Sequence, residues 1–232
     1  MIDRSLNYGR HHIKRFLENA ADSQLILDLG AGHGDDLLLG KEAHPHAELH
    51  AVEAYPPYAD ELKSKKITVH SLDIEKDPLP FSDASVDVVI MNQILEHVKE
   101  VFWIFHEVSR VLKVGGSFII GVPNLAALHN RFLLMIGRQP TPLKNWSAHV
   151  RGWSKADMKT FLKECFDGYE LKDFGGGNFY PFPPIIAKPL AALLPNMAWG
   201  IFMHWQKEKL YDRQFLEYPA AQRLETNFFT GE

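Results

Sequence analysis

Cysteine is almost absent from this 232-residue sequence, which contains only Cys165. A single cysteine excludes a disulfide framework and a zinc site built from several thiolates, and it favours a cytoplasmic location. The first residues also lack the apolar stretch of a secretory signal peptide. No internal repeat or low-complexity tract is present, and a hydrophobic content of 46% is typical of a folded globular chain.

The sequence also lacks an uninterrupted hydrophobic run long enough to cross a membrane. Its most apolar stretch is residues 182–205, which Lys188 and several prolines interrupt. We expect this stretch to form a buried cover over the active site. Peripheral contact of residues 182–205 with a membrane surface is the alternative interpretation.

Basic residues are scarce in one long segment of the sequence, and acidic residues are scarce in another. Residues 22–100 contain sixteen Asp and Glu against six Lys and Arg, a balance of -10, whereas residues 125–163 contain seven Lys and Arg against one Asp, a balance of +6. The net charge of -4 conceals this contrast. An acidic first half followed by a basic segment indicates two different binding roles, although a solvated basic helix face is an equally good explanation.

Short apolar runs alternate with helical patterns in the first half of the chain. This alternation predicts βαβ units and a parallel sheet that helices cover on both faces. The second half predicts two further helices, the later one capped by Ser154, and then two strands. The predicted strands are 25–29, 49–53, 67–72, 86–91, 117–122, 169–174 and 198–205, and the predicted helices are 35–43, 56–65, 98–112, 125–136 and 154–165.

A glycine-rich turn, residues 28–35, follows the first predicted strand and opens a helix. Glycines there let the backbone approach a ligand, and the helix N-terminus offers free N–H groups to an anionic group. A dinucleotide, a nucleoside or a simple tight turn would all be compatible with such a segment. The third glycine, Gly34, comes one residue too early for the dinucleotide pattern G-x-G-x-x-G.

Polar residues stand where the next three strands end. Glu53 ends the second strand, where a carboxylate can accept hydrogen bonds from both hydroxyls of a ribose. Asp73 follows the third strand, where it can accept from an adenine amino group while Ile74 packs on the base. Asn92 and Gln93 end the fourth strand, at the edge that holds the ligand crevice in open α/β sheets.

Together these segments resemble the class I S-adenosylmethionine-dependent methyltransferases of the small-molecule type. The resemblance covers residues 24–123 and follows the family's order. The matching pieces are Ile26-Leu27-Asp28-Leu29-Gly30-Ala31-Gly32-His33-Gly34, Val52-Glu53-Ala54, Leu72-Asp73-Ile74-Glu75, residues 79–89, Leu95-Glu96-His97-Val98 and Val111-Leu112-Lys113-Val114-Gly115-Gly116.

This resemblance implies an α/β fold, a Rossmann-like three-layer α/β/α sandwich around a seven-stranded, mostly parallel sheet whose last strand is antiparallel. It implies a methyltransferase domain over 1–209, with an N-terminal cap helix in 1–21, substrate-side insertions at 124–168 and 175–197, and a C-terminal tail at 210–232. S-adenosylmethionine would be the cofactor and S-adenosylhomocysteine the product. The implied cofactor-binding residues are Tyr8, Arg10, Asp28, Gly30, Ala31, Gly32, Gly34, Glu53, Ala54, Asp73, Ile74, Asn92 and Gln93.

Methyl transfer to oxygen usually needs a base that removes the acceptor's proton, and imidazole titrates near neutral pH. His97 and His149 are therefore the catalytic candidates, although His97 could instead only position its loop. His149, Arg151, Trp153 and Tyr180 are the candidate acceptor-contact residues. No metal site is predicted, because His44, His46 and His50 straddle Pro45 and a helix–strand turn.

The basic segment favours a small polar or anionic acceptor, including one linked to a sugar or a lipid, and oxygen as the accepting atom. An RNA or other nucleic-acid methyltransferase is the first alternative. The locally confined positive charge disfavours it, because nucleic-acid binding favours a broad basic face. A non-catalytic protein that binds S-adenosylmethionine is the second alternative, and the oligomeric state cannot be predicted from these residues.

Overall fold

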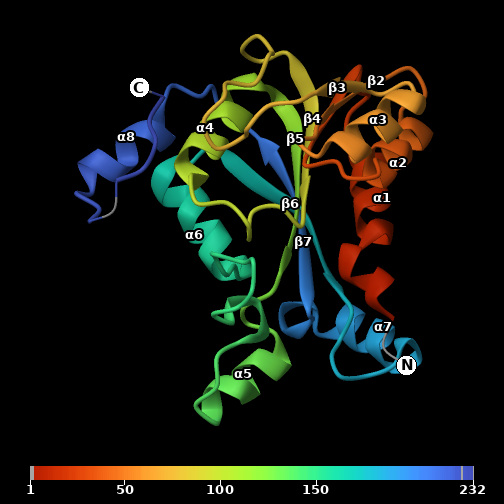
Figure 1. The fold of residues 1–232 in the computed structure, drawn as a ribbon, viewed down its shortest axis with the longest axis vertical. Coiled ribbons are helices and arrows are strands. Elements are labelled where there is room, and N and C mark those ends of the chain that lie inside the picture. The colour runs from red at the N-terminus through yellow and green to blue at the C-terminus, as the bar shows by residue number, and fades with distance from the viewer. Residues whose placement is uncertain (1–2, 226, 232) are drawn as a thin grey trace.

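A seven-stranded sheet runs through the centre of the computed structural model, which describes residues 3–225 and 227–231. Its strand order is β3-β2-β1-β4-β5-β7-β6 (Figure 1). Strand β7 is antiparallel to both of its neighbours, and the other strands are parallel, as predicted. The strands are β1 Leu25–Leu29, β2 Glu48–Val52, β3 Thr68–His70, β4 Val86–Asn92, β5 Leu112–Pro123, β6 Tyr169–Gly177 and β7 Gly200–Lys207.

Helices cover both faces of the sheet, which confirms the predicted three-layer sandwich. In Figure 1, α1, α2 and α3 lie on one face and α4, α6 and α8 on the other. Each face buries its own apolar cluster, one around Phe16 of α1 and one around Phe105 of α4. The helices are η1 Arg4–Tyr8, α1 Arg10–Asn19, α2 Asp35–Ala43, α3 Pro56–Ser64, α4 Val101–Val111, α5 Leu128–Met135, η2 Thr141–Leu143, α6 Lys155–Cys165, α7 Pro184–Leu193, η3 Pro195–Met197 and α8 Gln214–Ala221.

Most predicted elements form with small shifts of their ends. The largest shift is in β5, which begins at Leu112 and includes the Gly115–Gly116 pair that predicts a turn. The pairing of β4 and β5 shifts register between Val86 and Val88, so that β5 carries extra residues opposite this point. Ser154 caps α6 as predicted, because its Oγ accepts a hydrogen bond of 3.1 Å from the Asp157 N–H.

The segment predicted as a C-terminal tail packs on the domain. Helix α8 buries Phe215 and Leu216 beside α4, and the rings of Phe228 and Phe229 lie edge-on to Phe102 and Trp103. The described residues of α8 and of 227–231 therefore contribute to the helical layer.

Residues 182–205, predicted to form an apolar cover although their last part is also predicted as a strand, divide into two unlike parts. Strand β7 lies inside the sheet, and its Ile201, Phe202 and Met203 are fully buried. Helix α7 is largely on the surface, with Ile185 83% and Leu193 76% exposed. The expected burial is thus wrong for α7, and membrane contact is excluded for β7. An apolar run in a central strand and one on a surface helix look alike in sequence.

The parallel strands end at the lower edge of the sheet in Figure 1, where α5 and α7 also lie. Asn124, directly after β5, is 1% exposed and joins these parts. Its amide donates hydrogen bonds of 2.9 Å to the carbonyls of Asn196 and Ala198, and its Oδ1 accepts one of 2.9 Å from the Ala126 N–H. This side chain therefore links the start of the α5 segment to the η3–β7 connection.

We expect Asn124→Ala to lower the free energy of unfolding by about 2–4 kcal/mol, because it leaves buried carbonyls without donors. Urea denaturation would measure the loss. Asn145→Ala, at an exposed position, is the matched control and should change stability by less than about 0.5 kcal/mol. Equal stability of the two variants would contradict the linking role of Asn124.

Candidate active site

The glycine turn after β1 lies where the strand order reverses, between β1 and β4. Ligands bind at such switch points, outside the carboxyl ends of the strands. Gly30 has φ +75°, and a Cβ there would overlap the Cδ1 atom of Ile94. Gly32 has φ +52°, and no atom lies within 4 Å of the place that a Cβ would take, so its backbone faces open space. The turn is therefore both tight and accessible to a ligand.

Glu53 is fixed by the backbone around it. Its Oε2 accepts a hydrogen bond of 2.9 Å from the Gly32 N–H, and its Oε1 accepts one of 2.8 Å from the Tyr55 N–H. The residue is 9% exposed. The carboxylate is thus held between the glycine turn and the end of β2, with lone pairs left for further donors.

A cavity of about 520 Å³ opens beside Glu53. Asp73 lies on its wall, and its Oδ1 accepts a hydrogen bond of 3.0 Å from the Glu75 N–H. The hydrogen bond from Lys76 is the main reason that the pKa of Asp73 is lowered, so its carboxylate stays ionised. The lining residues are Gly30, Val52, Glu53, Ala54, Ser71, Leu72, Asp73, Ile74, Lys76 and Asp77. The structure thus brings several of the predicted cofactor residues together around one cavity.

Asn92 joins the end of β4 to the N-terminal segment. Its Nδ2 donates to Asp36 Oδ2 at 2.8 Å and to the Tyr8 carbonyl at 3.0 Å. Arg10, whose guanidinium lies 5.0 Å from the Tyr8 ring centroid, forms an ion pair with Asp35. The cap residues Tyr8 and Arg10 therefore lie at this edge, but Arg10 already has a carboxylate partner from α2.

Two acids beneath the turn are buried without full charge compensation. Burial, together with the nearby charges of Asp36 and Glu53, raises the pKa of Asp28 well above its ordinary value. Burial likewise raises the pKa of Asp36, against the opposing effects of the Asn92 hydrogen bond and of Arg10. Asp36 is not among the residues predicted from the sequence, although its place in the first turn of the helix after the glycines was a signal.

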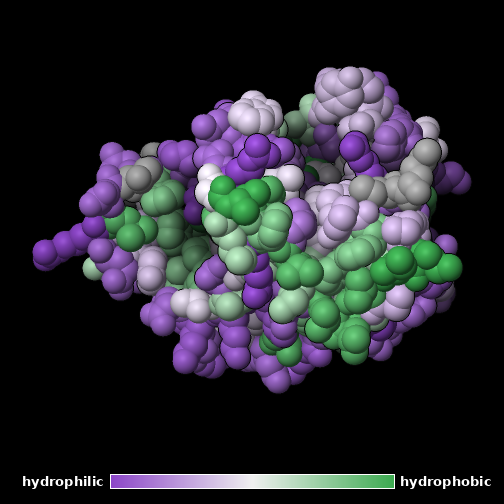
Figure 2. Space-filling model, turned by 90° about the horizontal axis from the view of Figure 1, so that it is seen from below, coloured by the Kyte–Doolittle hydropathy of each residue, from purple (hydrophilic) through white to green (hydrophobic). Residues whose placement is uncertain are grey.

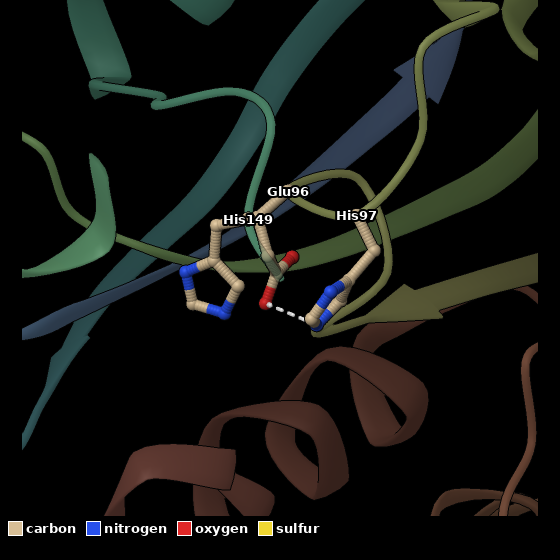
Figure 3. A group of neighbouring side chains, drawn as sticks. All are labelled: Glu96, His97 and His149. Atoms are coloured by element: carbon tan, nitrogen blue, oxygen red, sulfur yellow. Dashed lines mark ion pairs between the residues drawn. The ribbon is translucent and has the colours of Figure 1, made fainter. Parts of the chain in front are cut away.

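The two candidate histidines meet beside a buried acid. The rings of His97 and His149 are 4.6 Å apart between centroids, and Glu96 lies between them (Figure 3). Burial raises the pKa of Glu96 to about 8. The pKa of His149 is lowered, first by burial and then by His97. Glu96 is also absent from the predicted site residues, although it adjoins His97 in the Leu95–Val98 motif.

The remaining acceptor candidates do not gather at one point. Arg151 lies near the histidines, and its Nη2 donates to the Lys99 carbonyl at 3.0 Å. Trp153 is 5% exposed in the core, with its Nε1 donating to the Leu95 carbonyl at 3.4 Å, which argues against direct contact with an acceptor. Tyr180 lines a different, apolar cavity, and its hydroxyl accepts a hydrogen bond of 3.0 Å from Asn7.

Gln93 has φ +63°, a left-handed conformation that is uncommon for residues other than glycine. Its N–H donates to the Gly121 carbonyl at 2.7 Å, which holds the turn after β4 against β5. Gly121 is a further residue that the sequence did not single out. A Cβ there would overlap Asn92 Oδ1, so glycine leaves room for the Asn92 amide. Strained backbone of this kind often accompanies functional sites.

Comparison with known proteins agrees with this geometry. Residues 27–120 match the model of a family described as a methyltransferase domain. A Mycolicibacterium smegmatis protein described as a "probable S-adenosylmethionine-dependent methyltransferase" is 29% identical over 176 residues, which are 72% of this chain and 60% of that protein. The chain therefore spans less than two thirds of this curated relative.

Two further comparisons cover the fold and a shorter segment. A malonyl-[acyl-carrier protein] O-methyltransferase of Xylella fastidiosa is 29% identical over 99 residues, which are 41% of this chain and 34% of that protein. The crystal structure of a SAM-dependent methyltransferase from Archaeoglobus fulgidus superposes with a TM-score of 0.62 at 15% identity, covering 88% of this chain and 95% of that one. The second likeness is one of fold.

The buried Asp28 makes stability depend on pH. Because the pKa of Asp28 is higher in the folded than in the unfolded protein, the folded state binds its proton more tightly. This group therefore lowers stability as the pH rises above about 4, the ordinary value. We expect Asp28→Asn to gain stability relative to the wild type as the pH is raised from 4 to 7.

Urea denaturation across this pH range would measure the difference between the two proteins. Asp60→Asn, at an exposed site on α3, is the control and should follow the wild-type pH dependence. Parallel curves for wild type and Asp28→Asn would contradict the raised pKa.

Proposed function

We propose that this chain is a class I S-adenosylmethionine-dependent methyltransferase, and that it transfers a methyl group to oxygen of a small anionic acceptor linked to a lipid. The single observation that carries the cofactor assignment is the Glu53 carboxylate, held between the glycine turn and the 520 Å³ cavity. Because the chain spans only part of its curated relatives, its activity and acceptor are inferred from its own residues.

The site fits S-adenosylmethionine in shape and charge. The open space over Gly32 admits the methionine part of the cofactor. The Glu53 carboxylate can accept hydrogen bonds from the ribose hydroxyls, and Ile74 offers an apolar wall for the adenine base. The Glu53 and Asp73 carboxylates on the cavity wall favour a ligand that carries a cationic sulfonium. When bound, the cofactor supplies a methyl group that is already activated for transfer, so the chain's residues mainly position the acceptor and exclude water.

A basic cavity supports an anionic acceptor. It has a volume of about 380 Å³ and lies between the α5 segment and α6. Three of its lining residues are cationic, Arg131, Lys155 and Lys159, and Asn124 and Asn196 add amide groups. The positive charge of the sequence segment 125–163 is therefore partly gathered around one cavity, which suits a compact anion better than an extended nucleic acid.

An apolar cavity on the other side of α5 supports the lipid linkage. It has a volume of about 640 Å³ and is lined by Leu128, His129, Phe132, Leu133, Tyr180, Pro181 and Phe182. Helix α5 thus borders a basic cavity through Arg131 and an apolar one through Phe132. An acceptor with an anionic head and an apolar chain would match both sides of this helix.

Large exposed side chains of α5 and α7 extend the apolar surface. Figure 2 shows green side chains gathered on the face at the carboxyl edge, with hydrophilic residues around them. The contributors include Phe132, Leu134, Met135, Ile136, Ile185, Ile186 and Leu193. Such a surface on a protein of this size favours contact with an apolar partner. Lys188 and Arg138 nearby in the chain would favour an anionic membrane surface.

No helix among residues 3–225 and 227–231 has the length and apolar character needed to span a membrane. We therefore infer peripheral contact, with α5 and α7 in the lipid interface. A segment of this chain is similar in sequence to a malonyl-[acyl-carrier protein] O-methyltransferase, which supports oxygen as the accepting atom. The histidine pair near β4 supports the same atom, because oxygen acceptors must lose a proton.

We expect Glu53→Gln to weaken S-adenosylmethionine binding about 10-fold to 100-fold, because charged hydrogen bonds of about 1.5–3 kcal/mol are lost. Isothermal titration calorimetry would measure the dissociation constant. Glu48→Gln is the matched control at the opposite, exposed end of β2 and should bind as the wild type does. Absence of binding by the wild-type chain would overturn the proposed function, and equal binding by the Glu53 variant would overturn the role of this residue.

We expect Ile185→Ser with Leu193→Ser to lower binding to vesicles of phosphatidylcholine and phosphatidylglycerol several-fold, because two large apolar side chains leave the interface. Vesicle sedimentation would measure the bound fraction. Val114→Ser with Leu210→Ser removes comparable exposed side chains elsewhere and should leave the bound fraction unchanged. Equal loss in both double variants, or no binding by the wild type, would contradict membrane contact through α7.

A further inference from the structure

Glu96, His97 and His149 form a compact group at the carboxyl end of β4. Each offers one ligand atom, and these atoms all lie within 4.8 Å of one another. His97 Nε2 is 3.9 Å from Glu96 Oε1, and the His97 and His149 rings stand at an interplanar angle of 82°. In Figure 3 the three side chains converge from the loop after β4 and from the segment before α6.

Hydrogen bonds to the backbone join the loop of Glu96 and His97 to the segment of His149, although about fifty residues separate the two in sequence. The Val150 N–H donates to the Glu96 carbonyl at 2.8 Å, which fixes the segment carrying His149 to the loop carrying Glu96. His97 Nδ1 lies 3.4 Å from the Ala148 carbonyl. If His97 carries its proton on Nδ1, that N–H points to the Ala148 carbonyl. The unprotonated Nε2 of His97 then faces Glu96 and can bind a metal ion. Such outer contacts orient histidines that bind metals.

Two polar atoms of the group lack hydrogen-bond partners within residues 3–225 and 227–231. Glu96 is 2% exposed, and its Oε2 has no hydrogen-bond partner among the described residues. The same is true of His149 Nδ1. Within the described chain no Lys or Arg side chain forms an ion pair with Glu96. Buried polar atoms in native proteins are nearly always paired, so two unpaired atoms in one small group indicate that something else binds there.

A simple histidine–glutamate contact explains this arrangement less well. The 3.9 Å between His97 Nε2 and Glu96 Oε1 exceeds hydrogen-bond length, and it leaves Glu96 Oε2 unpaired. A cation would satisfy the carboxylate and both imidazoles at once. Ligand atoms that each bind one ion at about 2.1 Å lie about 3.0–3.4 Å from one another in cis octahedral or tetrahedral positions. The ligand atoms of Glu96, His97 and His149 lie within 4.8 Å of one another, so a small inward rotation of these side chains would bring them to bonding distance of one ion.

We propose that Glu96, His97 and His149 bind a divalent cation that accepts imidazole ligands, such as Mn²⁺, Fe²⁺ or Zn²⁺. Two imidazoles and one carboxylate on one side of the ion leave further positions open. His97 is exposed, so the open side faces solvent and can receive an acceptor. The ion site stands on these three residues alone, and only its use in catalysis rests on the proposed function.

In that use, Glu96, His97 and His149 would hold the ion, which would lower the pKa of an acceptor hydroxyl beside it. The O–H bond would break and its proton would leave to solvent water. The acceptor oxygen would then form a bond to the methyl carbon as the carbon–sulfur bond breaks, with the electron pair of that bond left on sulfur, giving S-adenosylhomocysteine. As ligands, neither His97 nor His149 would act as the general base that the sequence predicts. Activation by a metal ion would take the place of proton abstraction by imidazole.

The test is titration of the metal-free, chelator-treated chain with Co²⁺ and Mn²⁺, without acceptor or S-adenosylmethionine. Co²⁺ gives visible absorption bands that report its ligands, and free Mn²⁺ is counted by electron paramagnetic resonance. We expect one ion per chain, and at least tenfold weaker binding in Glu96→Gln and in His149→Asn. His46→Asn, which removes an exposed histidine elsewhere, is the matched control and should bind as the wild type does.

Calorimetry with S-adenosylmethionine on the same variants separates loss of the ion site from loss of folding. A variant that keeps cofactor binding but loses the ion supports the site. No saturable binding of either ion by the wild-type chain, or equal binding by the wild type and both site variants, would overturn it. Ion binding by a chain that fails to bind S-adenosylmethionine would preserve this inference and overturn the proposed function.

Discussion

The structure depends on one constraint, namely that strands β1 to β5 are parallel and lie in a sheet that helices cover on both faces. Such strands can be joined only through crossovers, so their carboxyl ends and the loops that follow them meet at one edge. The reversal of strand order between β1 and β4 separates the loops there and leaves room for a ligand. The glycine turn, Glu53, Asp73 and the loop of Glu96 all owe their proximity to this arrangement.

Charge divides the carboxyl edge into two regions with different chemistry. Asp28, Asp36 and Glu53 lie around the glycine turn, and Arg10 reaches Asp36 Oδ1 at 3.8 Å. Arg131, Lys155 and Lys159 line the cavity between the α5 segment and α6. A cationic sulfonium and an anionic acceptor would each meet the opposite charge. The buried acids around the glycine turn lower the stability of the fold. Groups with strongly shifted pKa values are common in active sites, so this loss of stability agrees with a binding role for the turn.

Helix α5 and helix α7 lie outside the two helical layers that cover the sheet. They leave the carboxyl edge after β5 and before β7, and Asn124 attaches both connections to the core. Many of their apolar residues are exposed, so they add little to the two main clusters that cover the sheet. The core can therefore remain stable while these two helices contact an acceptor or a lipid surface.

Local spacing and the positions of strand ends were enough to predict the alternation of strands and helices, the Ser154 cap, and the glycine turn with the acids that follow it. The places of other residues depend on tertiary packing. Trp153, predicted to contact the acceptor, is buried, and α7, predicted to be part of a buried cover, is largely exposed. Glu96 and His149 are far apart in sequence, and hydrogen bonds between two loops bring them together. Contacts of this kind depend on how loops pack, which hydrophobic periodicity does not encode.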